Sequence, residues 1–245
     1  MIKKIFLSSI HVLFFLPILA LQVDNEIDSL GLSPLFSDHM VLQQKSEVTF
    51  WGTSKPSNEI VISSTWGKEV KTTVDKKGDW SVSLKTPIAG GPYRIEIQSG
   101  NHKKIINDVW IGEVWLASGQ SNMEMTLLGW PPNDIINNAE EEIAKSANPN
   151  IRMFNVEKQI SLIPLNTIKG SWKISSPEET KHFSASGYFF AKELYKRLQI
   201  PIGIIHSSWG GTPAESWTSK KTIDTFDDLK KIKQSFSTSS EYQSE

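Results

Sequence analysis

The stretch that decides the fold runs Val114-Trp115-Leu116-Ala117-Ser118-Gly119-Gln120-Ser121-Asn122-Met123. Its first four residues are apolar, which is typical of a strand buried between layers of helices in a parallel sheet. The small residues that follow favour a tight turn, and the backbone N–H groups just after a serine in such a turn face the position of a carbonyl oxygen. Ser121 is therefore a candidate nucleophile, and a nucleophilic serine also needs a base.

The residues after Val109 alternate between strand and helix patterns. The predicted elements are a strand at 114–117, a helix at 134–145, a strand at 150–156, a helix from a cap at Ser184 or Ser186 to Gln199, and a strand at 201–205. This order is the signature of an α/β domain with a parallel sheet. Three strands are few for such a sheet, so we expect the α/β domain, residues 109–245, to be incomplete. A further amphipathic helix is expected from Asp227 onward.

The residues before Val109 have the pattern of a small β domain. Strands are predicted at 47–52, 59–63, 69–74, 80–84 and 93–97. Each is short, several alternate strictly between apolar and polar residues, and Gly or Pro turns separate them. The sequence thus predicts a small antiparallel β-sandwich at residues 30–108.

The first residues read as an export signal. Lys3 and Lys4 precede a mostly apolar stretch at 5–19, and Ala20 offers a cleavage position. A membrane anchor is the rival interpretation, but the stretch is short for a bilayer span and contains Pro17. We therefore expect a signal peptide at 1–21, no stable membrane anchor after its removal, and a periplasmic or secreted protein. The chain has no cysteine, so its fold cannot rely on disulfides.

Composition excludes several classes of function. The 26 basic and 27 acidic residues give a net charge of −1, and no basic block supports binding to nucleic acid. No residues have the spacing of metal ligands, and no glycine-rich phosphate loop is present, so neither a metal nor another cofactor is expected.

A second loop follows the last predicted strand and contains Gly210-Gly211-Thr212-Pro213. Ligand sites in open α/β sheets gather at the carboxyl ends of parallel strands, where this loop and the turn at Ser121 both lie. With Pro213 at the first position of a helix, the glycines would point free N–H groups at an anion. Taken alone, the glycine pair is more simply explained as a tight turn into a helix.

Five motifs stand in the following order along the chain. They are Leu35-Phe36-Ser37-Asp38-His39-Met40-Val41-Leu42-Gln43, Gly90-Gly91-Pro92-Tyr93, Ile111-Gly112-Glu113-Val114-Trp115, Ser118-Gly119-Gln120-Ser121-Asn122-Met123-Glu124 and Trp209-Gly210-Gly211-Thr212-Pro213-Ala214-Glu215-Ser216-Trp217. Together they resemble the sialate O-acetylesterase family, a branch of the SGNH hydrolases. The resemblance runs from about residue 30 to 225. It implies a β domain ahead of a flavodoxin-like SGNH domain, and hydrolysis of acetyl esters on sialic acid or other glycans.

The resemblance also implies roles for individual residues. Ser121 matches the nucleophile, and its N–H matches an oxyanion donor together with the N–H of Gly210 or Gly211. Gln120 and Asn122 would support the loop through side-chain hydrogen bonds. Glu215 and Trp217 match structural or rim positions.

Nine tryptophans suggest stacking against sugar rings. Core packing is the better explanation for Trp51, Trp80 and Trp115, which fall within predicted strands. The tryptophans near the proposed rim are the candidates for a sugar platform; they are Trp130, Trp209 and Trp217.

The family's base and its partner come late in the chain, as an Asp and a His a few residues apart, and no Asp-x-x-His pattern follows Ser121 here. His206 alone stands at the end of a predicted sheet strand, and a buried, hydrogen-bonded histidine is its favoured interpretation. We expect a C-terminally truncated esterase that is nearly inactive, because loss of the base costs several orders of magnitude in rate. A glycan-binding accessory module and a fragment without function are the alternatives.

Overall fold

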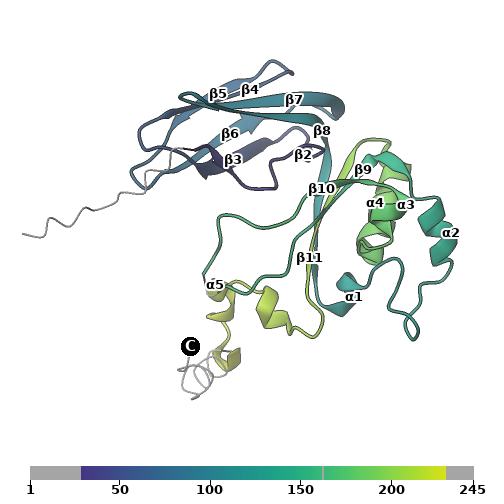
Figure 1. Ribbon diagram of the computed structural model, residues 1–245. Coiled ribbons are helices and arrows are strands. Elements are labelled where there is room, and N and C mark those ends of the chain that lie inside the picture. Colours follow the sequence, from purple (N-terminus) through teal and green to yellow (C-terminus); the bar gives the residue numbers. More distant parts are fainter. Residues whose placement is uncertain (1–28, 162, 230–245) are drawn as a thin grey trace, which may run out of the picture.

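The computed structural model describes residues 29–161 and 163–229, so the expected signal peptide and most of the tail after Asp227 lie outside it. The described chain has an all-β part and an α/β part, joined by the long strand β8 (His102–Gly119) (Figure 1). This arrangement confirms the predicted fold class, a small antiparallel β unit followed by a parallel α/β sheet. No helix within the described ranges is long and apolar enough to cross a membrane.

The all-β part is built from two packed sheets. One contains β1 (Gly31–Leu32), β3 (Glu47–Thr53) and β6 (Asp79–Lys85), and the other brings β5 (Glu69–Thr73), β4 (Glu59–Ser64) and β7 (Gly90–Ser99) to the first half of β8. All five strands predicted here are present to within a few residues. Alternate residues of these strands point inward, and Phe50, Ile60 and Ile97 are fully buried between the sheets.

Strand β8 belongs to both parts of the molecule. Its first half pairs antiparallel with β7, while residues from Glu113 to Gly119 pair parallel with β11 (Ile202–Ser208). The change of partner occurs at Gly112, where an added Cβ would lie 1.9 Å from the carbonyl oxygen of Pro201, so only glycine fits. The predicted boundary between 108 and 109 therefore falls inside a continuous strand, and independent folding of residues 30–108 stays a prediction. Strand β2 (Val41–Gln43) pairs parallel with β8 beside this point.

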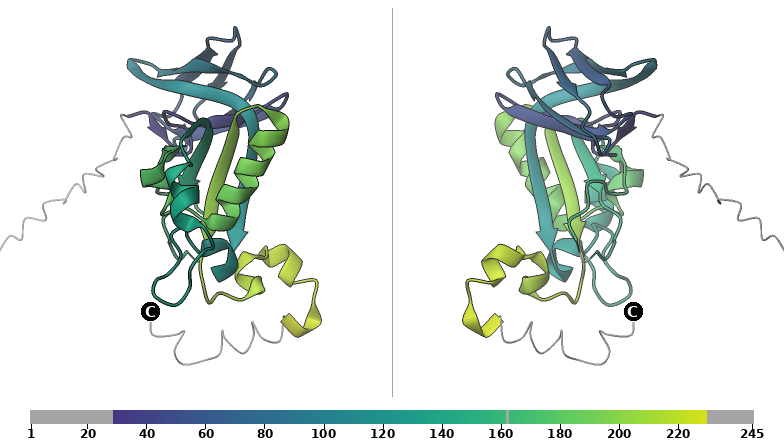
Figure 2. Two further views of the ribbon diagram at one scale, coloured as in Figure 1. Left: turned by 90° about the vertical axis from the view of Figure 1, so that its right-hand side faces the viewer. Right: turned by 90° about the vertical axis from the view of Figure 1, so that its left-hand side faces the viewer.

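The α/β part is a four-stranded sheet covered by helix α4 (Ala185–Leu198). Strand β9 (Asn148–Asn155) pairs parallel with β11, which pairs with β8, and β10 (Trp172–Ser175) adds an antiparallel edge. Figure 2 shows α4 lying along one face of these strands. As predicted, Ser184 caps this helix, accepting a hydrogen bond from the N–H of Gly187 at 3.1 Å. The buried face of α4 packs Tyr188 and Ala191 against β9 and β11.

Two sequence predictions in this part are wrong. The helix expected at 134–145 is only α2 (Ala139–Ala144), because Asn138 has a φ of 58° and the backbones of Trp130 and Asp134 close a loop by two hydrogen bonds. The strand at 114–117 is not buried on both faces, since Trp115 is 46% exposed and Leu116 66% exposed. Trp115 is thus not a core residue; its ring meets the half-exposed Phe190 edge to face at 5.2 Å.

Several short elements complete the fold. They are α1 (Ser121–Glu124), α3 (Pro177–Thr180), the 3-10 helix η1 (Ala214–Trp217) and α5 (Lys220–Ile223). Helix α1 and the segment from η1 to α5 lie at the end of the parallel strands farthest from the all-β part (Figure 1).

A charged cluster joins the two parts near the middle of β8. Asp108 Oδ2 lies 2.7 Å from Nη1 of Arg152 and 2.6 Å from Nδ1 of His39, and Trp110 Nε1 donates to Asp108 Oδ1. Burial disfavours ionisation of Asp108, but these three hydrogen bonds outweigh it and lower the pKa of its carboxyl. The Arg152 side chain is 3% exposed, so its buried positive charge needs the carboxylate of Asp108 to balance it.

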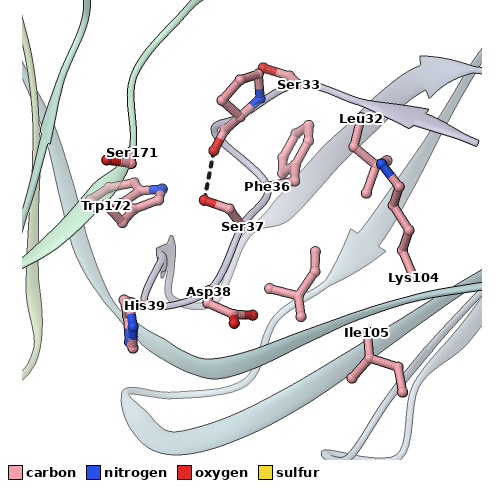
Figure 3. Close-up of a pocket in the computed structure, with 12 residues that line it drawn as sticks. Leu32, Ser33, Phe36, Ser37, Asp38, His39, Lys104, Ile105, Ser171 and Trp172 are labelled. Atoms are coloured by element: carbon pink, nitrogen blue, oxygen red, sulfur yellow. Dashed lines mark hydrogen bonds between the residues drawn. The ribbon is translucent and has the colours of Figure 1, made fainter.

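A cavity of about 530 Å³ lies beside this cluster, between the loop at 33–39 and the start of β10. Figure 3 shows His39 and Trp172 on its lining, with the Ser37 hydroxyl donating to the Pro34 carbonyl at 2.8 Å. The loop is tied to β10 because Trp172 Nε1 donates to the Leu35 carbonyl at 2.9 Å. The all-β part therefore contacts the edge of the α/β sheet through a backbone carbonyl as well as through charged side chains.

Asp108→Asn tests the charged cluster, because asparagine tolerates the positive φ of 52° at this position but cannot balance Arg152. We expect a loss of about 2–3 kcal/mol in the free energy of unfolding, measured by urea denaturation. Glu59→Gln, which breaks an exposed pair with Lys71, is the control and should cost less than about 0.5 kcal/mol. Equal, small losses of unfolding free energy in both variants would contradict a stabilising role for the charged cluster.

Candidate active site

The candidate nucleophile stands at the first position of α1, directly after the sheet. Strand β8 ends at Gly119, whose φ of 135° turns the chain, and Gln120 precedes the helix in an extended conformation. The half-buried Ser121 therefore faces the end of the sheet with its own N–H unused by the helix. Within the described ranges no group accepts a hydrogen bond from that N–H.

The N-terminus of α4 holds this turn through its serines. Ser184 Oγ donates to the Met123 carbonyl at 2.5 Å, and Ser186 Oγ donates to the Asn122 carbonyl at 2.9 Å. The Gln120 carbonyl accepts from the N–H groups of Met123 and Glu124. Backbone carbonyls of Gln120 and Asn122 thus support the turn, and the described residues show none of the side-chain hydrogen bonds expected for these two residues.

The loop that contains Gly210 and Gly211 (the glycine loop) meets the turn that contains Ser121 (the nucleophile turn). It does so because β8 and β11 run parallel in register. Ser208 is the partner of Gly119, and the N–H of Trp209 donates to the Gly119 carbonyl at 2.9 Å. A Cβ placed on Gly210 would lie 3.5 Å from the Cβ of Ser121. The structure therefore brings together the two loops that the sequence put at the carboxyl ends of the strands.

The two glycines of this loop differ in what their N–H groups do. The N–H of Gly210 donates to Oε2 of Glu124, the last residue of α1. Gly211 is exposed, has a φ of 79°, and its N–H has no acceptor among the described residues. The loop leads only to the four-residue η1, with Pro213 as its N-cap. The expected helix therefore begins at Ala214, one residue later than predicted, and is a short 3-10 helix.

Lys158, in the segment after β9, adds a positive charge to the site. Its ammonium pairs with Oε1 of Glu124 and lies 5.4 Å from the centroid of the Trp209 ring. The hydrogen bond from Lys158 is the largest influence on Glu124 and lowers the pKa of its carboxyl, with burial opposing and the N–H of Gly210 assisting. Glu124 is therefore ionised at neutral pH.

His206 lies beneath the nucleophile turn but is occupied. Its Nδ1 lies 2.6 Å from Asn155 Oδ1, and its Nε2 lies 2.6 Å from the hydroxyl of Ser208. The ring is buried, and burial lowers the pKa of His206, so the neutral imidazole is the stable form. This is the buried, hydrogen-bonded histidine that the sequence favoured, and it links β9 to β11.

Two of the three candidate rim tryptophans share a cavity. Trp209 and Trp217 line a cavity of about 890 Å³ between the segment at 156–168 and the loop after β11, and Trp217 Nε1 donates to the Thr212 hydroxyl at 2.8 Å. Trp130 is not among the residues that line it; it is 39% exposed in the loop before α2. Glu215 is exposed on η1. No group of three His, Asp or Glu side chains within the described ranges could hold a metal ion.

Sequence reasoning missed two residues of this site. Glu124 stands three residues after Ser121, and on a helix that spacing puts both on one face, so the signal was available. Lys158 comes from a segment without regular pattern, and only the three-dimensional structure brings it to Glu124.

His206→Gln tests the buried imidazole through pH. A folded-state pKa below the unfolded value near 6.5 means that the unfolded chain protonates first, so stability is full above pH 6.5 and falls as the pH drops. Between pH 7.5 and 5.5 we expect the free energy of unfolding to fall less steeply in His206→Gln than in wild type. The two slopes should differ by up to about 1.4 kcal/mol per pH unit. Identical slopes in wild type and His206→Gln would contradict a buried neutral His206.

Comparisons with known proteins agree with this geometry. Residues 111–243, more than half of the chain, match the family described as "Carbohydrate esterase, sialic acid-specific acetylesterase". Sialate O-acetylesterases of Rattus norvegicus and Homo sapiens are 32% and 33% identical over 76% of this chain, which spans only 37% and 38% of their length. A carbohydrate acetylesterase from Xanthomonas citri superposes with a TM-score of 0.74 and 35% identity, over 82% of this chain and 44% of its own. The chain therefore belongs to the carbohydrate esterase family of sialic acid-specific acetylesterases.

Proposed function

We propose that this chain carries the nucleophile of a carbohydrate O-acetylesterase, and that Ser121 attacks acetyl esters on glycans. The supporting observation is the contact between the Ser121 turn and the glycine loop at the carboxyl ends of β8 and β11. The sugar is O-acetylated sialic acid or another O-acetylated glycan. Export to the periplasm or the medium, proposed from residues 1–21, suits a glycan substrate.

The proposed chemistry is acyl transfer in two steps. Ser121 Oγ gives up its proton to a base and attacks the acetyl carbonyl carbon; the C–O bond to the sugar then breaks, and the sugar oxygen takes a proton. Water next attacks the acetyl-serine, which releases acetate and restores the hydroxyl. The N–H groups of Ser121 and Gly211 are the donors that this structure leaves free for the oxyanion, since Gly210 donates to Glu124.

The base is the part of this mechanism that neither His206 nor His39 supplies in this structure. His206 is committed on both ring nitrogens, to Asn155 and Ser208, and His39 pairs with Asp108 in the joint. We therefore propose that neither of these imidazoles is the base, and that the purified chain hydrolyses esters slowly.

Turnover of p-nitrophenyl acetate tests the nucleophile and the missing base together. We expect negligible hydrolysis by the purified chain, and a Ser121-dependent increase when free imidazole is added as a substitute base. Ser121→Ala should abolish that increase, whereas Ser118→Ala, in the same turn, should retain it.

Two outcomes would contradict the proposal. Fast hydrolysis without imidazole that Ser121→Ala abolishes would mean that a base is already present, and His206 would then be the first candidate. An imidazole effect that is equal in wild type and Ser121→Ala would remove Ser121 as nucleophile. Tight binding of acetylated glycans without cleavage, in that case, would favour the glycan-binding alternative through the cavity of Trp209 and Trp217.

A further inference from the structure

We propose that Glu124 is a positioning residue that clasps the glycine loop and the Lys158 segment around the nucleophile turn. The inference extends the role proposed for Ser121, because the clasp decides which backbone N–H of the loop remains available beside that hydroxyl. It concerns a side chain that takes no part in the acyl-transfer steps themselves.

The carboxylate of Glu124 uses its two oxygens on two different segments. Oε2 accepts from the N–H of Gly210, which is 86 residues away in the chain, and Oε1 accepts from the ammonium of Lys158, 34 residues away. The Glu124 side chain is only 21% exposed. One carboxylate thus connects α1, the loop after β11 and the segment after β9.

A side chain at Gly210 would press on the Glu124 carboxylate, which would have to move to make room for it. An added Cβ there would lie 2.8 Å from Oε2 of Glu124 and 3.5 Å from Cβ of Ser121. The absence of a side chain is what lets the loop backbone approach the carboxylate and the serine at once. The register of β8 and β11 brings the loop to the nucleophile, and the Glu124 contact then holds the Gly210 peptide there.

The clasp also gives the N–H groups of the two glycines different hydrogen-bonding states. The Gly210 N–H points at Glu124 and is lost as an oxyanion donor, while the Gly211 N–H is left without an acceptor among the described residues. Without the carboxylate, the Gly210 peptide could rotate and the loop could move away from Ser121. A displacement of about 1 Å at such a site costs up to about 100-fold in rate.

A surface ion pair would not behave in this way. Lys145 and Glu141 form such a pair within one stretch of chain, at 2.5 Å, with side chains 69% and 63% exposed. Pairs of this kind contribute little and fix no loop. Glu141→Gln is therefore a matched control for changes at Glu124.

Amide hydrogen exchange on the full chain, followed residue by residue by NMR at neutral pH, tests the clasp without any need for turnover. In wild type we expect the Gly210 amide to be protected and the Gly211 amide to exchange freely. Glu124→Ala should lower the protection of Gly210 by about tenfold or more, with amides of β8 and β11 unchanged. Glu124→Gln, which keeps an acceptor oxygen, should restore most of it, and Glu141→Gln should change nothing.

Lys158→Met covers the case in which Glu124→Ala does not fold. It removes the ammonium but keeps the acceptor, so Gly210 should lose less protection than in Glu124→Ala and more than in Glu141→Gln. Unchanged protection of Gly210 in both Glu124→Ala and Lys158→Met would overturn the clasp.

The catalytic consequence has its own measurement, the imidazole-dependent hydrolysis. We expect Glu124→Ala to lower kcat by about tenfold or more with KM nearly unchanged, and Glu124→Gln to recover part of it. If Ser121→Ala has no effect in that assay, the proposed nucleophile fails while hydrogen exchange still decides the clasp. If Ser121 matters but Glu124→Ala leaves kcat unchanged, the positioning role fails alone.

Discussion

The parallel pairing of β8 with β11 is the constraint on which the site depends. It places Ser208 opposite Gly119, so that the turn holding Ser121 and the loop holding Gly210 leave the sheet side by side. Every later contact of the site follows from that register, including the Trp209 N–H to the Gly119 carbonyl and the carboxylate of Glu124 on the loop. A shift of β11 by one residue would move each of its side chains to the opposite face of the sheet and displace the glycine loop from its place beside the Ser121 turn.

The same strand also carries the all-β part, and this makes the first half of the chain relevant to the site. β8 changes partner from β7 to β11 at Gly112, and Asp108 on β8 bonds Arg152 of the α/β sheet and His39 of the all-β part. Arg152 lies on β9, so a charge on the all-β side directly holds a strand of the α/β sheet. The all-β part thus supports the sheet from the end opposite to the candidate active site (Figure 1).

Sequence patterns predicted those parts of the structure that depend on residues close together in the chain. Alternation predicted the strands of the all-β part, a serine cap predicted the start of α4, and the small residues after β8 predicted the turn at Ser121. The helix at 134–145 failed because the closed loop from Trp130 to Asp134 and the left-handed Asn138 override helical periodicity. Other features depend on which distant segments become neighbours, and a single sequence does not contain that information. They are the exposure of Trp115, the antiparallel edge strand β10 and the pairing of Lys158 with Glu124.

We propose Ser121 as the residue that accepts the acetyl group. Its most direct test is mass spectrometry of peptides from the chain after incubation with p-nitrophenyl acetate and imidazole. We expect a transient acetyl group on the Ser121 hydroxyl, absent in Ser121→Ala. The buried Ser208, bonded to His206, should remain unmodified. Acetylation of Ser208, or imidazole-dependent turnover with no acetyl group on Ser121, would contradict the account.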